Sequence, residues 1–146
     1  MTENKFDFLK KYNIQKKINA LEKKYKNKKV LLYGANDFSG YIFENYNLSM
    51  LNIIGITDKI FQNNMPDSFK GFDCINPRNL KNKEFDIILI SDFESQNAYR
   101  ILDEEILYGT KYAQTEIRPL ISFTFKEIFL SKEEFLKFKS YKQINL

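Results

Sequence analysis

The chain has 146 residues, a hydrophobic content of 43% and a formal net charge of +4, values that fit one domain with one packed core. It contains no histidine and a single cysteine, which excludes His-based catalysis, His metal ligands and a thiolate zinc site, so we expect no metal. No apolar run approaches the roughly 18 residues that span a bilayer, and no secretory leader is recognisable, so we expect a cytoplasmic protein without a transmembrane segment.

The N-terminal segment holds all of the basic excess. Residues 1–29 contain ten lysines against three acidic residues, a balance of +7, whereas the remainder carries −3. Four apolar residues recur there at helical spacing: Ile14, Ile18, Leu21 and Tyr25. We therefore predict an N-terminal basic amphipathic helix within residues 1–28, docked through its apolar face with its lysines exposed. The alternative is an adhesive helix for nucleic acid or anionic lipid. Lysine outnumbers arginine 20 to 3 and no nucleic-acid-binding motif is present, so we expect no specific nucleic-acid partner.

The most informative stretch is KKVLLYGANDFSG, from Lys28 to Gly40. An apolar run ends at Gly34 and is followed by a predicted helix over about Phe38–Tyr46, as in the strand, glycine turn and helix of a nucleotide-binding βαβ unit. Backbone N–H groups and the helix dipole attract phosphate at such a turn. We therefore predict a cofactor-binding turn made of seven residues: Gly34, Ala35, Asn36, Asp37, Phe38, Ser39 and Gly40.

The glycine pattern of this turn is incomplete. A full Gly-x-Gly-x-x-Gly fingerprint maps to Gly34, Asn36 and Ser39, so only the first glycine is in register. Asn36 would crowd a pyrophosphate, and its amide can instead contact a ligand or its backbone can adopt the left-handed conformation. A turn that kept its shape and lost its ligand is the alternative. Either Asn36 or Asp37 can cap the helix.

A second apolar strand, Leu51–Thr57, ends at Asp58, which lies 24 positions after Gly34. In dinucleotide-binding folds an acidic residue about 20 positions on holds a ribose hydroxyl. Asp58 is therefore a candidate ribose ligand, and a strand-end turn residue is the alternative.

The remaining chain alternates strands and helices. After a polar loop, we predict a strand at Phe72–Ile75, a capped helical turn at Asn76-Pro77, and a buried strand at Phe85–Ile90 that ends at Ser91. Cys74 is interpreted as a small core residue rather than a nucleophile.

The C-terminal third is expected to contain a helix over about Glu94–Leu107 and a fifth strand near Gln114–Ile117. A helical tail should follow over Ser122–Tyr141, with a capping box at Ser131 and Glu134.

This alternation predicts an α/β protein with a three-layer Rossmann-like fold and about five parallel strands in the order 3-2-1-4-5. We expect one domain, with an N-terminal helix (1–28), a βαβ core (29–121) and a helical tail (122–146). A ligand should lie at the carboxyl ends of the strands, beside Gly34, Asn36, Asp58 and Ser91, with no metal at the site.

Four successive motifs carry a family resemblance: YGANDFSG, IIGITD, FDCINPRNL and FDIILIS. Over about Lys29–Leu107, the chain resembles a small Rossmann-like domain common in bacterial surface-polysaccharide biosynthesis. It is similar to the N-terminal domain of sugar O- and N-acyltransferases that bind nucleotide sugars, and to the C-terminal domain of certain sugar methyltransferases. The resemblance implies that Gly34 and Asn36 form the phosphate turn, that Asp58 binds ribose and that Ser91 lies beside the ligand crevice.

The chain departs from this family pattern at two positions. Lys59 stands where the family has a second acidic residue, and Asn36 replaces a glycine. The sequence contains no left-handed β-helix repeat and no methyltransferase domain.

We therefore predict a nucleotide- or nucleotide-sugar-binding module in bacterial polysaccharide or glycoconjugate biosynthesis that acts with a partner enzyme. The first alternative is a small NAD(P)-dependent or sugar-modifying enzyme whose site a second subunit completes, as in a homo-oligomer. The second alternative is an interaction domain that kept the fold without a ligand. No residue stands out as catalytic.

Overall fold

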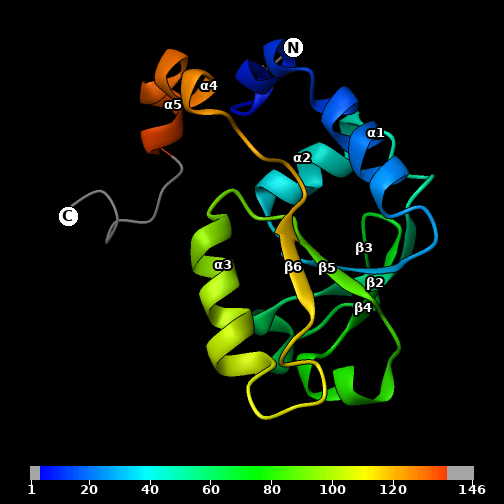
Figure 1. Ribbon diagram of the computed structural model, residues 1–146. Coiled ribbons are helices and arrows are strands. Elements are labelled where there is room, and N and C mark those ends of the chain that lie inside the picture. The colour runs from blue at the N-terminus through cyan, green and yellow to red at the C-terminus, as the bar shows by residue number, and fades with distance from the viewer. Residues whose placement is uncertain (1–3, 138–146) are drawn as a thin grey trace.

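The computed structural model describes residues 4–137, in which helices cover both faces of a six-stranded sheet (Figure 1). The strands are β1 (Lys29–Tyr33), β2 (Asn52–Thr57), β3 (Ser68–Phe69), β4 (Phe72–Ile75), β5 (Ile87–Ile90) and β6 (Glu116–Pro119). Their order is β3-β4-β2-β1-β5-β6, and all neighbouring pairs are parallel except β3 with β4. The prediction of an α/β protein with a mostly parallel sheet is confirmed.

The sequence did not predict β3. This strand has two residues, too few for a periodic pattern, and it pairs with β4 through a tight turn. Lys70 and Gly71 form that turn with positive φ angles of 50° and 89°, as two-residue hairpins of this twist require. The fifth predicted strand lies two residues later than expected, at β6, where Pro119 is tolerated because β6 is an edge strand.

The helices fall into two groups along the chain. The first group, up to residue 82, contains the 3-10 helix η1 (Asp7–Tyr12), α1 (Ile14–Lys24), α2 (Asp37–Asn45) and the 3-10 helices η2 (Lys59–Gln62) and η3 (Pro77–Asn82). The second group, from residue 95 on, contains α3 (Ser95–Ile101), its π-helical extension η4 (Leu102–Ile106), α4 (Phe125–Leu130) and α5 (Lys132–Lys137). None of the helices between residues 4 and 137 combines the length and the apolar composition that a membrane crossing requires.

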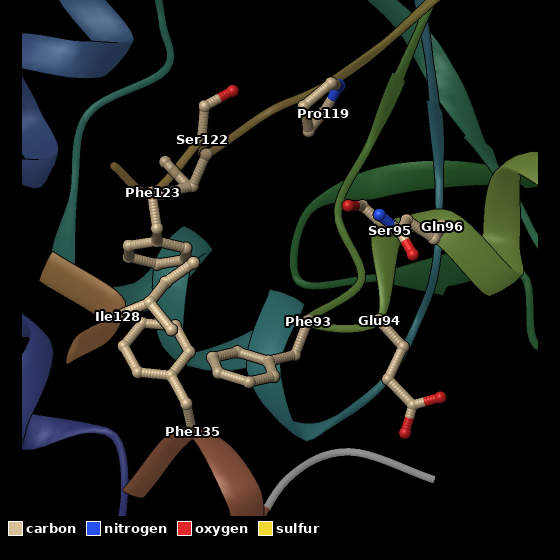
Figure 2. A pocket seen from close by; sticks show the side chains of 10 residues that line it. Phe93, Glu94, Ser95, Gln96, Pro119, Ser122, Phe123, Ile128 and Phe135 are labelled. Atoms are coloured by element: carbon tan, nitrogen blue, oxygen red, sulfur yellow. The ribbon is translucent and has the colours of Figure 1, made fainter. Parts of the chain in front are cut away.

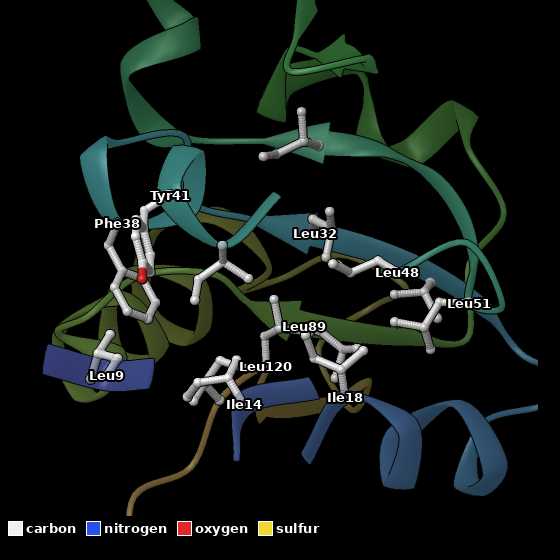
Figure 3. Packing of buried hydrophobic residues seen from close by; sticks show 14 of the residues in the cluster. Leu9, Ile14, Ile18, Leu32, Phe38, Tyr41, Leu48, Leu51, Leu89 and Leu120 are labelled. Atoms are coloured by element: carbon white, nitrogen blue, oxygen red, sulfur yellow. The ribbon is translucent and has the colours of Figure 1, made fainter. Parts of the chain in front are cut away.

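The alternating side chains of β1 divide the core between the two faces of the sheet. Val30 and Leu32 point to the face covered by α1 and α2, whereas Leu31 and Tyr33 point to the face covered by α3. Figure 3 shows the first of these clusters, where side chains from η1, from α1 and from the residue after β6 meet those of the sheet: Leu9, Ile14, Ile18, Leu32, Leu89 and Leu120.

The N-terminal segment is docked as predicted but is not one helix. Ile14, Ile18 and Tyr25 are buried and Leu21 is half-buried. Asn13 has a left-handed backbone conformation and separates η1 from α1. Lys17 is the exception among the exposed lysines of α1, because it reaches the C-terminal tail.

The C-terminal tail is helical from Phe125 to Lys137 apart from a break at Ser131, and the predicted continuation to Tyr141 lies outside the described residues. Its capping box is formed by Thr124 and Glu127, since the Glu127 N–H donates to Thr124 Oγ1 at 3.1 Å and the Thr124 N–H to Glu127 Oε1 at 2.8 Å. The predicted capping residue Ser131 is fully buried, and its hydroxyl is hydrogen-bonded to that of Tyr12.

Candidate functional site

The turn after β1 depends on Gly34. Its φ angle is +118°, a conformation that L side chains rarely adopt, and an added Cβ would lie 2.9 Å from the carbonyl oxygen of Ser91. The Gly34 N–H donates to the Thr57 carbonyl at 2.9 Å. The ends of β1, β2 and β5 therefore meet at one glycine.

Ser91 supports this junction from inside the protein. It is fully buried, and its hydroxyl donates to the carbonyl oxygens of Gly34 at 2.8 Å and Tyr33 at 3.1 Å. Ser91 is next in the chain to Asp92, which borders the crevice described below, and its own hydroxyl proton is used within the backbone junction.

Asn36 caps α2 and does not adopt the left-handed conformation. Its backbone is extended, with φ −152°, and its side-chain Oδ1 accepts from the Ser39 N–H at 3.0 Å. The Ser39 hydroxyl accepts from the Asn36 N–H at 2.8 Å, which completes a capping box. The Asn36 amide oxygen, which was a candidate ligand contact, therefore caps the N-terminus of α2.

The Asp58 carboxylate also accepts from a backbone N–H group of the turn that a bound phosphate would otherwise use. Its Oδ2 accepts from the Ala35 N–H at 2.9 Å, and its Oδ1 accepts from the Ile60 N–H at 3.1 Å. Asp37 adds a second carboxylate at the first residue of α2, where it pairs with Lys5 at 2.9 Å. The turn is thus self-capped and carries acidic side chains, which disfavour a phosphate group there.

The other two predicted turn residues have packing roles. Phe38 is buried, with its ring centroid 5.5 Å from that of Phe6 and 5.4 Å from that of Phe93. Gly40 is buried inside α2 beneath the side chains of Phe69 and Lys70. These two residues hold α2 against its neighbours.

A crevice of about 300 Å³ opens at the carboxyl ends of β1, β2 and β5, on the α3 side of the sheet. It is lined by residues from the ends of these strands, from η2 and from α3: Tyr33, Asp58, Lys59, Ile60, Gln62, Asn63, Asp92, Asn97, Ala98 and Ile101. This volume is at the lower end of the range for small-molecule sites. Of the predicted site residues, the structure brings Asp58 into this crevice.

Two further titratable groups of the crevice were not among the predicted site residues. Burial, followed by the negative charge of Asp58, raises the pKa of the Asp92 carboxyl. Burial and the same charge raise the pKa of Tyr33, so its hydroxyl stays neutral and keeps a proton to donate. The Tyr33 oxygen itself accepts from the Lys59 N–H at 3.3 Å.

The cationic residue of the crevice is already paired. Lys59 Nζ lies 2.6 Å from Glu105 Oε1, so its charge is shared with a carboxylate on η4. The crevice therefore offers acceptors from Asp58 and Asp92, a donor from Tyr33, and the amides of Gln62, Asn63 and Asn97. Within residues 4–137, no group of three or more acidic, Cys or His side chains gathers to hold a metal ion.

Cys74 is half-buried in β4, and burial raises the pKa of its thiol.

Asp92 carried a sequence signal that applies equally to Asp58. Asp58 directly follows β2 and Asp92 follows β5 after one intervening residue, Ser91, and parallel strands bring such positions to one edge of the sheet. Tyr33 had no such signal, because an aromatic residue at the end of an apolar run is typical of a core position.

A second cavity, also of about 300 Å³, lies on the other side of the segment that follows β5 (Figure 2). Phe93, Phe123, Ile128 and Phe135 form its apolar side, and Ser95 and Gln96 of α3 lie across from them. Asp92 borders the crevice and Phe93 borders this aromatic cavity, so one short segment separates the two spaces.

The family model described as C2185-like, N-terminal, matches residues 26–118, more than half of the chain. The matched range contains the glycine turn and the residues of the crevice, whereas α1, α4 and α5 lie outside it. No curated protein and no solved structure matches the chain.

Proposed function

The chain belongs to the C2185-like N-terminal family, and we propose that its crevice binds the nucleoside part of a nucleotide or nucleotide sugar. The observation that carries the proposal is the grouping of Asp58, Asp92 and Tyr33 at the carboxyl ends of three parallel strands. Ligands of open α/β sheets bind at this edge, where crossovers diverge. The strand order and the helices on both faces support a Rossmann-like assignment of the fold.

The donors and acceptors of the crevice match sugar hydroxyl groups. A carboxylate held by backbone N–H groups keeps lone pairs for a ribose diol, and Asp58 is held in this way by Ala35 and Ile60. The neutral Tyr33 hydroxyl supplies a donor to a ligand oxygen. A neutral hydroxylated group satisfies these side chains, whereas a phosphate beside two carboxylates would be repelled.

A phosphate of the bound ligand would lie away from the glycine turn. To bind there, a phosphate must displace Asp58 from the Ala35 N–H and compete with the Asn36–Ser39 capping box. A phosphate attached to a nucleoside in the crevice would instead face solvent. The sugar of a nucleotide sugar can extend past Asp92 to the aromatic cavity of Figure 2, whose rim carries Glu94, Ser95 and Gln96.

A thermal-shift panel tests this function. The probes are uridine, adenosine, UDP, UDP-glucose, NAD, S-adenosylmethionine and inorganic phosphate. A ligand at 100 times its dissociation constant stabilises a fold by about 2.7 kcal/mol, enough to raise the melting temperature measurably. We expect stabilisation by at least one nucleoside, and loss of that stabilisation in Asp92→Asn and Tyr33→Phe.

The matched control is Asp103→Asn, an exposed acidic position on η4 outside the crevice, which should keep the full response. Stabilisation by phosphate alone, or by no nucleoside-containing compound, would contradict the proposal.

A further inference from the structure

The two helices of the C-terminal tail are apolar on their outer side as well as on their inner side. Phe135 of α5 is buried, and its ring lies 5.7 Å from Phe8 and 4.9 Å from Phe123, measured between centroids. On the outer side, Phe125 and Phe129 of α4 expose 86% and 68% of their surface. No residue of α4 is buried.

These exposed residues form one continuous surface. A groove of about 320 Å³ is lined by Phe125, Ile128, Phe129, Lys132, Phe135 and Leu136. We call the four exposed apolar members, Phe125, Ile128, Phe129 and Leu136, the α4–α5 patch. It lies at the end of the molecule where the tail meets η1 (Figure 1).

The tail that carries the patch is anchored to the protein. Lys17 Nζ lies 2.7 Å from Glu127 Oε1 and 2.6 Å from the Ser122 carbonyl oxygen. The same ammonium group lies over the Phe123 ring, 4.9 Å from its centroid. Partial burial tends to raise the pKa of Glu127, but hydrogen bonds from Lys17 and Thr124 lower it overall, which keeps the ion pair charged. The patch is thus presented on a fixed support.

The size of the patch fits an interface between proteins. An aromatic side chain offers roughly 150–250 Å² of surface, so its two phenylalanines alone expose about 300 Å². The largest apolar patch on a typical monomer covers about 300–600 Å², and such patches mark interaction sites. A standard interface buries about 800 Å² on each partner, with an apolar centre of this order and a polar rim.

We propose that a second copy of this chain docks on the α4–α5 patch in a symmetric dimer. The patch combines two exposed phenylalanines with a groove that they line, so one surface supplies both the side chains and the recess that a two-fold interface needs. Residues 124–137 carry three lysines and three glutamates, so two copies do not repel each other there. Lys132 lines the groove, and the exposed Glu133 follows it in α5.

The same charge balance distinguishes a second copy from an anionic lipid surface. Peripheral helices that bind anionic membranes combine exposed Phe and Leu with an excess of Lys or Arg. The segment that bears the patch, residues 124–137, has no such excess, since its three lysines are balanced by three glutamates. Docking would also stabilise the outer wall of the aromatic cavity, since Ile128 and Phe135 line both spaces.

Light scattering coupled to size exclusion, supported by analytical ultracentrifugation, tests the proposal on the full chain. We expect the wild type to have twice the mass of the 17.4 kDa chain at micromolar concentration. Phe125→Glu and Phe129→Glu should each raise the dimer dissociation constant at least tenfold. Both should keep the wild-type circular dichroism spectrum and melting profile at low concentration, because these side chains contribute little to the monomer core.

The matched control is Tyr108→Glu, since Tyr108 is 80% exposed but lies in the loop after η4, away from the patch. This variant should dimerise as the wild type does. A wild-type chain that stays monomeric at 100 µM would overturn the proposal. It would also be overturned by a dimer that survives both Phe variants, or by co-sedimentation of a monomer with phosphatidylserine vesicles that Phe129→Glu abolishes.

Discussion

The Ala35 N–H donates a 2.9 Å hydrogen bond to the carboxylate of Asp58, which joins the glycine turn after β1 to the end of β2. This bond places a protein carboxylate on a backbone donor that a phosphate would otherwise use. It also orients Asp58 so that its remaining lone pairs are available to the crevice. The same bond thus disfavours phosphate binding at the turn and orients Asp58 to accept hydrogen bonds from a ligand in the crevice.

Asp58→Ala should lower the free energy of unfolding by about 1–3 kcal/mol, because two backbone N–H groups lose a charged acceptor. Asp58→Asn should cost less, since asparagine is an equally good cap for η2. Urea denaturation of both variants, with Asp103→Ala as the exposed control, measures the difference. A change below about 0.5 kcal/mol for Asp58→Ala would show that these bonds contribute little to the fold.

Gly34→Ala should lower the free energy of unfolding by at least about 2 kcal/mol, since a positive φ angle is strained for alanine and the Cβ meets the Ser91 carbonyl. Gly109→Ala is the matched control: Gly109 also has a positive φ angle, of 75°, but an added Cβ meets nothing within 4 Å. The difference between the two variants in denaturant unfolding isolates the steric contact. Equal losses would mean that the contact at Ser91 relaxes freely.

The sequence predicted the parts of this fold that rest on continuous apolar runs. Val30–Tyr33 and Ile87–Ile90 are buried along their whole length, and such runs leave few alternatives to a central parallel strand. The sequence did not predict the two-residue β3, nor the π-helical turn η4, because neither has a periodic signal.

The site was predicted less completely than the fold, for a physical reason. Gly34 and Asp58 have patterns that a sequence displays, a glycine after a strand and an acidic residue at a strand end. The hydrogen-bond partner of a polar side chain, in contrast, depends on the folded geometry. Asn36 is of a residue type that often contacts ligands, but its amide oxygen caps α2. Tyr33 reads as a core residue, yet its ring ends at a crevice.

Thr57→Val should leave the free energy of unfolding unchanged or raise it by up to about 1 kcal/mol. Thr57 is fully buried at the end of β2, and its hydroxyl has no hydrogen-bond partner among the described residues. Valine has the same shape without the polar atom. Thermal and urea unfolding test this, and a loss above about 1 kcal/mol would indicate that the hydroxyl is bonded in solution.

Asp92→Asn should change how stability depends on pH. The folded-state pKa of Asp92 is raised above its unfolded value of about 3.9, so the protonated form favours the fold. The stability from this group is therefore fully present below the unfolded pKa and is lost as pH rises through the folded pKa. Asparagine keeps the oxygen that accepts from the Glu94 N–H but has no charge to desolvate.

Relative to the wild type, Asp92→Asn should thus gain stability as the pH rises from about 3.5 to 7. Urea unfolding at a series of pH values measures this difference. A difference that is constant over the range would show that Asp92 titrates as an exposed carboxyl does.

Isothermal titration calorimetry provides the most direct test of nucleoside recognition in the crevice, using the nucleoside that gives the largest thermal shift and its own diphosphate. We predict dissociation constants within about tenfold of each other, a difference below about 1.4 kcal/mol, because the phosphates face solvent. Asp92→Asn should weaken both ligands by similar factors. A diphosphate that binds more than about 100-fold tighter than the nucleoside would place phosphate at the Asn36–Ser39 turn and contradict the proposed site.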